Sequence, residues 1–384
     1  MIRTYEEINE KIKKGKAVVF TAEEVIALAK EKGVKAVTNK VDVVTTGTFS
    51  PMCSSGAFLN LGHTDPPMKM SKVWLNEVEA YGGIAAVDCY LGATQLCENS
   101  NQPTYGGAHV LEALIKREKI KLRSSARITD CYPRKEIETE FDLDSINQAI
   151  LFNPRNVYQN YQAAVNSSLK TLYTYMGTLL PNFGNVTYAT SGEISPLLKD
   201  PEYRTIGIGT RIFIGGTIGY VAWEGTQHNP SQIRGSNKIP LDSAGSLALV
   251  GNLKKMERRY LRAAYFKGYG PTLYLGVGIP IPILDEALAE AVSINNKDIY
   301  TTVYDYAINK RSKPSYGRFS YQQLRSGSVN INGGKAIASP LSSLARAKEV
   351  CLVLKEWIGK GNFFLTQPLE GLSKDTKLNV LKEK

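Results

Sequence analysis

The stretch VDVVTTGTFSPMCSSG, residues 41–56, joins a strand pattern to a polar loop that contains a cysteine. Its β-branched beginning, residues 41–46, predicts a strand. The remainder is rich in glycine, serine and threonine and predicts a loop. Because α/β proteins tend to place ligands where a strand runs into a loop, this junction indicates a site near Cys53.

Outward from this stretch, helix and strand patterns interleave. Residues 5–15 have helical spacing, and Thr21 with Glu24 predicts a capping box at the start of a second helix. Residues 109–118 predict a helix, and residues 120–125 predict a strand. The interleaving favours a mixed α/β fold and leaves its topology open.

The second half of the chain continues this alternation. Residues 153–168 predict a loop that leads into a polar helix, and residues 205–230 predict short strands interrupted by glycine. Residues 272–292 predict a strand, a proline-rich turn and a helix. Residues 338–361 predict a long amphipathic helix that ends at glycine.

Length and composition limit the classes of protein. The chain has 384 residues, 43% of them apolar and 22% charged, so it can bury a sizeable core. This excludes wholesale disorder, collagen and disulfide scaffolds. No run of eighteen apolar residues occurs, and the charged N-terminus lacks an apolar signal core. We therefore expect a cytoplasmic location and no association with a membrane.

The net charge of +11 comes from 47 lysines and arginines against 36 aspartates and glutamates. The basic residues are scattered, and no nucleic-acid-binding motif accompanies them. We expect no nucleic-acid partner. The charge would instead attract acidic small molecules.

Five cysteines are present, without the close pairs that a structural zinc site needs. Cys53 has small neighbours that would leave its sulfur accessible. Cys131 is followed by Arg134 and Lys135, which could favour its thiolate, whereas Asp130 would oppose it. Each cysteine could instead fill a turn without reacting. Cys351 lies in a predicted helix, where a cysteine packs like a small apolar residue.

Other polar residues are candidates by their type. Histidines suit proton transfer, arginines in uncharged segments suit carboxylate binding, and acidic side chains suit an ammonium group. The candidates are His63 and His228 for proton transfer, Arg155 and Arg211 for a carboxylate, and Glu79 and Glu224 for an ammonium group.

Eight ordered motifs together resemble the homocysteine-biosynthesis (HcyBio) family. They are VDVVTTGTFSPMCSSGAFLNLGHTDPP, NEVEAYGG, TDCYPRKE, NPRNVYQ, TIGIGTRIFIGG, EGTQHNP, GVGIPIPIL and ASPLSSLARAKEV. The resemblance extends to about Leu369. It implies an enzyme of anaerobes, an L-aspartate semialdehyde sulfurtransferase that forms homocysteine from sulfide with two electrons. It also implies a cysteine persulfide, with Cys53 and Cys131 as the matching cysteines.

The resemblance further implies a domain organisation and a partner. We expect one catalytic domain over residues 1–371, which could divide into two lobes near residues 231–252, and a polar tail over residues 372–384. Many relatives continue into CBS modules, and we expect none in this chain. A ferredoxin-like protein is the expected electron donor, and a homo-oligomer is compatible with the sequence.

The expected mechanism uses both cysteines. A persulfide on Cys131, with Arg134 and Lys135 nearby, would attack the aldehyde, and Cys53 would resolve the adduct by thiol exchange. The two cysteines could also exchange roles. One alternative is a four-iron four-sulfur cluster held by Cys53, Cys131 and a third ligand, Cys97 or Cys89, with hydrosulfide on its open iron. Another is a non-catalytic carrier that delivers persulfide to a partner enzyme.

Overall fold

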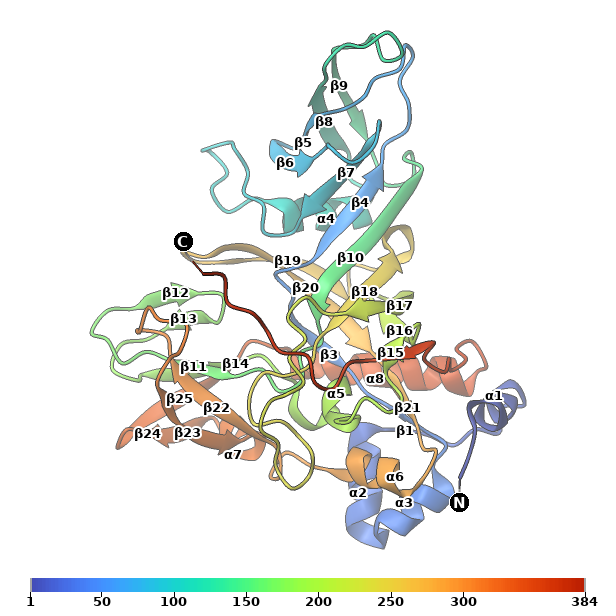
Figure 1. Cartoon of the computed structure of the whole chain (residues 1–384), viewed down its shortest axis with the longest axis vertical. Coiled ribbons are helices and arrows are strands. Elements are labelled where there is room, and N and C mark those ends of the chain that lie inside the picture. Colours follow the sequence, from blue (N-terminus) through green and yellow to red (C-terminus); the bar gives the residue numbers. More distant parts are fainter. Residues whose placement is uncertain (1, 383–384) are drawn as a thin grey trace.

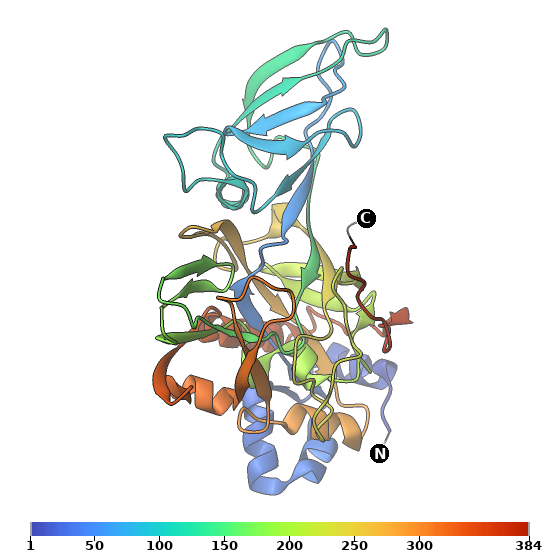
Figure 2. The ribbon, with the colours of Figure 1, turned by 60° about the vertical axis from the view of Figure 1, so that its left-hand side comes forward.

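The computed structural model describes residues 2–382, which form a broad body and a narrower arm that projects from it (Figure 1). Figure 2 shows that two strands carry the chain between these parts. The helices are α1 (Tyr5–Lys13), α2 (Ala22–Lys32), α3 (Val34–Lys40), α4 (Gly107–Ile115), α5 (Pro196–Lys199), α6 (Glu286–Ser293), α7 (Tyr321–Arg325) and α8 (Leu344–Gly359).

A 13-stranded sheet runs through both the body and the arm. Its order is β19-β20-β16-β17-β18-β10-β4-β7-β6-β5-β8-β9, and β3 pairs with β20. The strands are β3 (Thr48–Pro51), β4 (Gly56–Asn60), β5 (Lys72–Leu75), β6 (Val78–Tyr81), β7 (Asp88–Gly92), β8 (Ile120–Ser125), β9 (Glu136–Phe141), β10 (Gln148–Asn156), β16 (Arg211–Ile214), β17 (Thr217–Glu224), β18 (Leu247–Asn252), β19 (Leu261–Phe266) and β20 (Gly270–Gly278).

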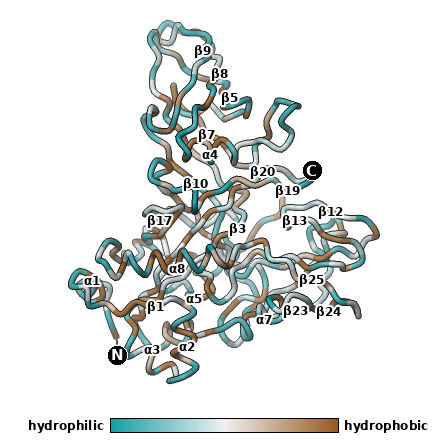
Figure 3. Tube along the Cα trace, turned by 180° about the vertical axis from the view of Figure 1, so that it is seen from behind, coloured by the Kyte–Doolittle hydropathy of each residue, from teal (hydrophilic) through white to brown (hydrophobic). Residues whose placement is uncertain are grey.

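The arm consists of β4 to β9 and helix α4. Its strands alternate buried and exposed residues, as in an antiparallel sheet with one face covered. Helix α4 provides the cover with Val110, Leu111 and Leu114, which are fully buried. The loops at the far end of the arm are mainly hydrophilic (Figure 3).

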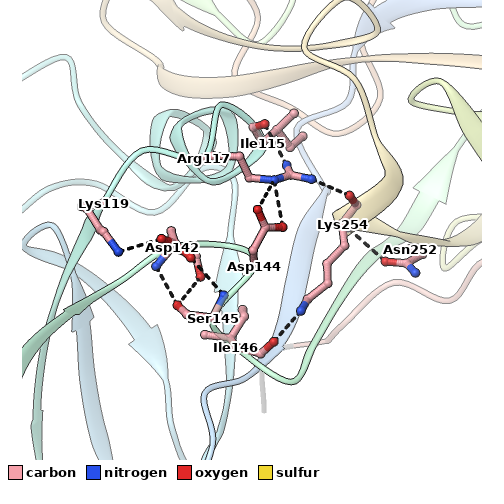
Figure 4. Close-up of polar contacts among 9 residues, drawn as sticks. All are labelled: Ile115, Arg117, Lys119, Asp142, Asp144, Ser145, Ile146, Asn252 and Lys254. Carbon is pink, nitrogen blue, oxygen red and sulfur yellow. Dashed lines mark hydrogen bonds and ion pairs between the residues drawn. The ribbon is translucent and has the colours of Figure 1, made fainter.

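A cluster of polar contacts joins the arm to the body (Figure 4). Arg117, just after α4, donates to the carbonyl oxygen of Lys254 at 2.8 Å and pairs with Asp144 at 3.0 Å. The Lys254 ammonium in turn donates to the carbonyl oxygen of Ile146. Since Lys254 belongs to the body and the other three residues to the arm side, these contacts link the arm to the body.

Smaller sheets complete the body. One contains β1 (Val19–Thr21), β2 (Val43–Thr45) and β21 (Pro280–Pro282). A six-stranded sheet has the order β23-β22-β11-β14-β25-β24 and a separate core. Its strands are β11 (Ala163–Val165), β14 (Asn185–Tyr188), β22 (Tyr300–Asp305), β23 (Ser315–Ser320), β24 (Ser328–Ile331) and β25 (Gly334–Pro340). Two short antiparallel pairs are β12 (Leu172–Thr174) with β13 (Gly177–Leu179), which form a hairpin, and β15 (Gly207–Ile208) with the distant β26 (Glu370–Gly371).

The mixed α/β class is confirmed, and so are several local predictions. The capping box is present: the Thr21 hydroxyl accepts from the Glu24 amide at 3.3 Å, and the Glu24 carboxylate accepts from the Thr21 amide at 2.7 Å. Residues 120–125 form β8 as predicted. Cys351 is buried in α8, which confirms its assignment to the core.

Two helix predictions were wrong. Residues 153–168 contain the end of β10 and all of β11, because their asparagines bond to distant segments, as Asn160 does to the carbonyl oxygen of Tyr300. The helix predicted from residue 338 begins at Leu344. Pro340 ends β25, and the Ser343 hydroxyl caps the helix.

The predicted break near residues 231–252 falls on the connection between β17 and β18, which are neighbours in the large sheet. Beyond β26, the tail lies along this connection, where the Ser373 amide donates to Glu224 and the Ser231 hydroxyl donates to the carbonyl oxygen of Thr376 at 3.4 Å. None of the helices in residues 2–382 combines the length and apolar character needed to cross a bilayer.

Candidate active site

A cavity of about 340 Å³ lies in the body, where the turn between β3 and β4 meets the end of β10. The tips of two hairpins, β12–β13 and β19–β20, also reach it. The lining residues are Thr48, Ser50, Pro51, Met52, Cys53, Ser54, Arg155, Val157, Tyr158, Tyr161, Tyr175, Met176, Ala189, Thr190, Ser195, Pro196, Gln227, Tyr269 and Leu341. The cavity therefore carries one cysteine, one arginine and four tyrosines.

Cys53 reaches the cavity because its turn is fixed from several sides. The Ser55 amide donates to the carbonyl oxygen of Met52 at 3.0 Å and closes the turn. Asn153, fully buried in β10, accepts from the Ser54 hydroxyl at 3.0 Å and donates to the Ser55 hydroxyl at 2.7 Å. These bonds hold the partly buried thiol at the cavity wall.

The Cys53 sulfur accepts a hydrogen bond from the Thr272 hydroxyl at 3.2 Å. Thr272 belongs to β20 and is fully buried, so this donor has no competing water. Hydrogen bonds to a sulfur anion favour the charged form. The thiol therefore has a partner suited to a thiolate or a persulfide.

Arg155 is the only charged residue among the side chains that line the cavity. Its guanidinium forms no ion pair with any carboxylate of residues 2–382, and it affects the titration of Tyr158 and Tyr269 through its charge. A partly buried arginine without a protein partner is well suited to a carboxylate of the substrate.

Tyrosines form the rest of the polar wall. The rings of Tyr158 and Tyr161 meet edge to face at 4.7 Å, and the Tyr175 hydroxyl lies 2.8 Å from that of Tyr306. Burial raises the pKa of Tyr158 to about 12 and that of Tyr161 further. These hydroxyls stay protonated at neutral pH and can donate hydrogen bonds.

The structure does not bring Cys131 to this cavity. Cys131 is exposed in the loop between β8 and β9, at the end of the arm, with its sulfur 3.5 Å from the Thr129 hydroxyl. One row of paired residues crosses the sheet from Phe58 to Ser125, through Tyr90, Tyr81 and Lys72. Four strand spacings make this row about 19 Å long.

The two cysteines also lie on opposite sides of that row. Cys53 precedes Phe58 in the chain, whereas Cys131 follows Ser125, and the successive antiparallel pairings make β4 and β8 run in the same direction. Thiol exchange between Cys53 and Cys131 of one chain, as the sequence suggested, is therefore not supported by this conformation.

The cations beside Cys131 have other partners. The Arg134 guanidinium donates to the carbonyl oxygen of Asp65, and the exposed Lys135 ammonium lies 3.4 Å from Glu136. Their place in the sequence predicted that they stabilise the Cys131 thiolate, but in the structure both cations bind other oxygen atoms.

The remaining candidates do not line the cavity. His63 and Glu79 belong to the arm, and Arg211 donates to the carbonyl oxygen of Phe364. His228 is buried beside Gln227, and its ring nitrogens contact the carbonyl oxygens of Ser246 and Ser373. Glu224 accepts from the Ser373 amide. These contacts give His228, Glu224 and Arg211 structural partners instead of access to the cavity.

The cysteines suggested as iron–sulfur ligands lie apart. Cys97 donates to the carbonyl oxygen of Asn76 in the arm, Cys89 is buried in β7, and Cys53 lines the cavity. Within the part of the chain that the structure describes, no three histidine, cysteine or acidic side chains group as metal ligands. The residues of one chain thus do not fit a cluster.

Sequence reasoning missed the tyrosines of the cavity and the Thr272 donor. The density of uncharged polar residues around Arg155, in NPRNVYQNYQ (residues 153–162), was the available signal. Tyr175, Tyr269 and Thr272 come from hairpins distant in sequence, and no local pattern indicates that they approach Cys53.

The cavity thus holds one thiol and one arginine in its wall. The family model "Homocysteine biosynthesis enzyme, sulfur-incorporation" matches residues 17–365. The chain belongs to this homocysteine biosynthesis family, which confirms the resemblance.

Two relatives carry the name L-aspartate semialdehyde sulfurtransferase. The one from Methanosarcina acetivorans is 50% identical over 381 residues, which cover 99% of this chain and 74% of the relative. The one from Methanocaldococcus jannaschii is 48% identical over 388 residues, covering 97% and 74%. An uncharacterized protein of Methanothermobacter thermautotrophicus is 28% identical over 338 residues, covering 85% and 73%. No solved structure matches the chain.

Proposed function

We propose that the chain is an L-aspartate semialdehyde sulfurtransferase that forms homocysteine with sulfur carried on Cys53. The observation that carries the proposal is that Cys53 and the unpaired Arg155 line one cavity. The two relatives that are 50% and 48% identical to this chain are named L-aspartate semialdehyde sulfurtransferase, which supports aspartate semialdehyde as the substrate.

Arg155 binds the α-carboxylate of the substrate, and the aldehyde then extends toward the Cys53 sulfur. No acidic side chain lines the cavity, so the ammonium group lies against the faces of the tyrosine rings, as cations do in aromatic cages. The carbonyl group of Gln227, at the cavity rim, is a further acceptor. These groups take the place of Glu79 and Glu224, which the sequence analysis offered as partners of the ammonium group.

The chemistry requires a second thiol. Hydrosulfide attacks a disulfide that includes Cys53, which leaves sulfur on Cys53 as a persulfide and releases the partner thiol. The persulfide adds to the aldehyde carbon. The partner thiol then attacks Cys53, restores the disulfide and releases a carbinol thiol. Loss of water gives a thioaldehyde, and two electrons with two protons reduce it to homocysteine.

We assign the partner thiol to Cys131 of a second copy of the chain. Support comes from its exposure at the end of the arm and from the absence of a second cysteine among the residues that line the cavity. A ferredoxin-like protein remains our proposed electron donor. The assignment reverses the persulfide and resolving roles first given to Cys131 and Cys53.

The test is homocysteine formation in an anaerobic assay with sulfide, aspartate semialdehyde and a chemical reductant. Cys53→Ser and Cys131→Ser should each lose nearly all activity, and the buried Cys351→Ser should retain it. Cys53→Ser and Cys131→Ser chains that are refolded together should regain activity. In a dimer of one chain of each variant, Cys53 of the Cys131→Ser chain can meet Cys131 of the Cys53→Ser chain. Full activity of Cys53→Ser would contradict the proposal, and product formed only with an added partner enzyme would favour a carrier.

A further inference from the structure

The β19–β20 hairpin carries one tyrosine to the cavity. Its tip contains Gly268 and Gly270, whose φ angles of +69° and +130° suit glycine, and the Tyr269 amide donates to the carbonyl oxygen of Phe266 at 3.0 Å. A Cβ atom at Gly268 would lie 2.7 Å from the Cβ atom of Tyr173. The backbone of the tip, and with it the position of Tyr269, is thus closely defined.

Tyr269 is next to the proposed sulfur carrier. Its side chain and the Cys53 thiol line the same cavity, and its ring centroid lies 6.2 Å from that of Tyr175. Thr272, three residues further along the same hairpin, bonds to the Cys53 sulfur. One hairpin therefore supplies two hydroxyl groups around Cys53.

The addition step needs a donor at this place. When sulfur attacks the aldehyde carbon, negative charge develops on the carbonyl oxygen, and a fixed donor there lowers the barrier. The two histidines first considered as acids, His63 and His228, do not line the cavity. Thr272 is directed at the sulfur, and the hydroxyls of the other three cavity tyrosines bond to Gln227, Tyr175 and Tyr306. Tyr269 is therefore the cavity tyrosine whose hydroxyl has no hydrogen bond to the described residues.

We propose that Tyr269 is a catalytic residue whose hydroxyl protonates the aldehyde oxygen while the Cys53-bound sulfur attacks the carbon. The proposal rests on the proposed function. The carbon–sulfur bond forms, the π-bond electrons of the carbonyl move to oxygen, and oxygen takes the proton of Tyr269. Water returns the proton, since Tyr269 is 39% exposed. No electron donor takes part in this step.

The surroundings of Tyr269 agree with this role. Partial burial of the side chain and the nearby Cys53 raise the pKa of Tyr269 well above its ordinary value. The hydroxyl therefore keeps its proton at neutral pH until a strongly basic oxygen forms beside it.

The experiment compares Tyr269→Phe with Tyr274→Phe. Tyr274 lies on the same hairpin, but its hydroxyl donates to the carbonyl oxygen of Leu341 at 3.0 Å. Homocysteine formation is measured anaerobically, and sulfur bound to Cys53 is measured by mass spectrometry after exposure to polysulfide. Tyr269→Phe should reduce turnover about 10²–10³-fold, as for loss of one oxyanion donor, with unchanged sulfur on Cys53. Tyr274→Phe should keep both the turnover and the Cys53-bound sulfur of the wild type.

Turnover by Tyr269→Phe equal to that of the wild type would overturn the proposal. An equal fall in sulfur on Cys53 and in turnover would also overturn it, since Tyr269 would then serve the thiol and not the aldehyde. A wild-type protein that forms no homocysteine would contradict the proposed function itself, and this proposal with it.

Discussion

At the scale of single residues, the Cys53 sulfur depends on a donor that has no exposed surface, the hydroxyl of Thr272. Thr272→Val keeps the shape of the side chain and removes that donor. A hydrogen bond to a charged group contributes about 1.5–3 kcal/mol, so Thr272→Val should slow the alkylation of Cys53 at pH 8 about 10–100-fold.

The alkylation rate of each cysteine at pH 8, followed by mass spectrometry, measures this change. Cys131 is the internal control, because it is exposed at the end of the arm and its rate should not change. An alkylation rate of Cys53 unchanged by Thr272→Val would show that the hydroxyl does not stabilise the sulfur anion.

We predict that Arg155 sets the affinity for the substrate. Arg155→Met removes a charge-assisted contact to the α-carboxylate, so KM should rise about 10–100-fold while the folded protein keeps its stability. Arg211→Met is the matched control, since Arg211 lies outside the cavity and bonds to Phe364. Steady-state kinetics of both variants give the answer, and an equal effect on KM would refute the role of Arg155.

At the scale of elements, the tip of the β19–β20 hairpin should tolerate little change. Gly268→Ala adds a Cβ atom 2.7 Å from Tyr173 at a φ of +69°, so it should displace Tyr269 and lower turnover at least tenfold. Gly327→Ala has a similar backbone strain, with φ at +94° and no atom within 4 Å.

Both glycine variants should lose about 1–2 kcal/mol of unfolding free energy from the left-handed conformation. Only Gly268→Ala should also lose activity at a temperature where it is fully folded. Denaturant unfolding and an activity assay on the same samples separate the two effects. Similar activity in both variants would show that the position of the hairpin tip does not matter.

Helix α5 begins at the cavity and ends at a lysine that is fully buried. The Lys199 ammonium donates to the carbonyl oxygen of Val292 at 2.8 Å and to that of Ile294, near the end of α6. Burial lowers the pKa of Lys199 to about 7, although Glu193 opposes the shift. In the unfolded chain a lysine keeps its proton up to about pH 10.4.

Between pH 7 and pH 10 the unfolded state therefore binds more protons than the folded state, so Lys199 makes stability increase with pH. The unfolding free energy of the wild type minus that of Lys199→Met should rise over this window and be flat below it. Urea unfolding at pH 6, 7, 8, 9 and 10 tests this. A constant difference would refute the lowered pKa, and Lys199→Gln replaces Lys199→Met if that variant does not fold.

At the scale of the whole molecule, the sequence predicts what depends on neighbours along the chain. The capping box at Thr21, strand β8 and the mixed fold class follow from local patterns. Cys53 was noted for its small neighbours, but the loop predicted around it was wrong in part, because residues 48–51 form β3 through pairing with the distant β20. The 13-stranded sheet did not follow from any pattern, because its order depends on pairings between distant strands.

The candidate site shows the same limit. Arg155 was considered because it is an isolated charge in an uncharged segment, whereas Tyr175 and Tyr269 come from two hairpins that meet only in the folded chain. The cations that follow Cys131 were expected to act on it. In the fold, Arg134 and Lys135 bond to Asp65 and Glu136, since charged side chains pair with whatever acceptor is near in space.

The central claim is that sulfur on Cys53 becomes the sulfur of homocysteine, and a single-turnover labelling experiment tests it most directly. The protein is exposed to polysulfide labelled with heavy sulfur, freed of unbound sulfur, and mixed anaerobically with aspartate semialdehyde and reductant. We predict labelled homocysteine in an amount equal to the label lost from Cys53, and none from Cys53→Ser. Label that stays on Cys53, or equal labelled product from Cys53→Ser, would contradict the account.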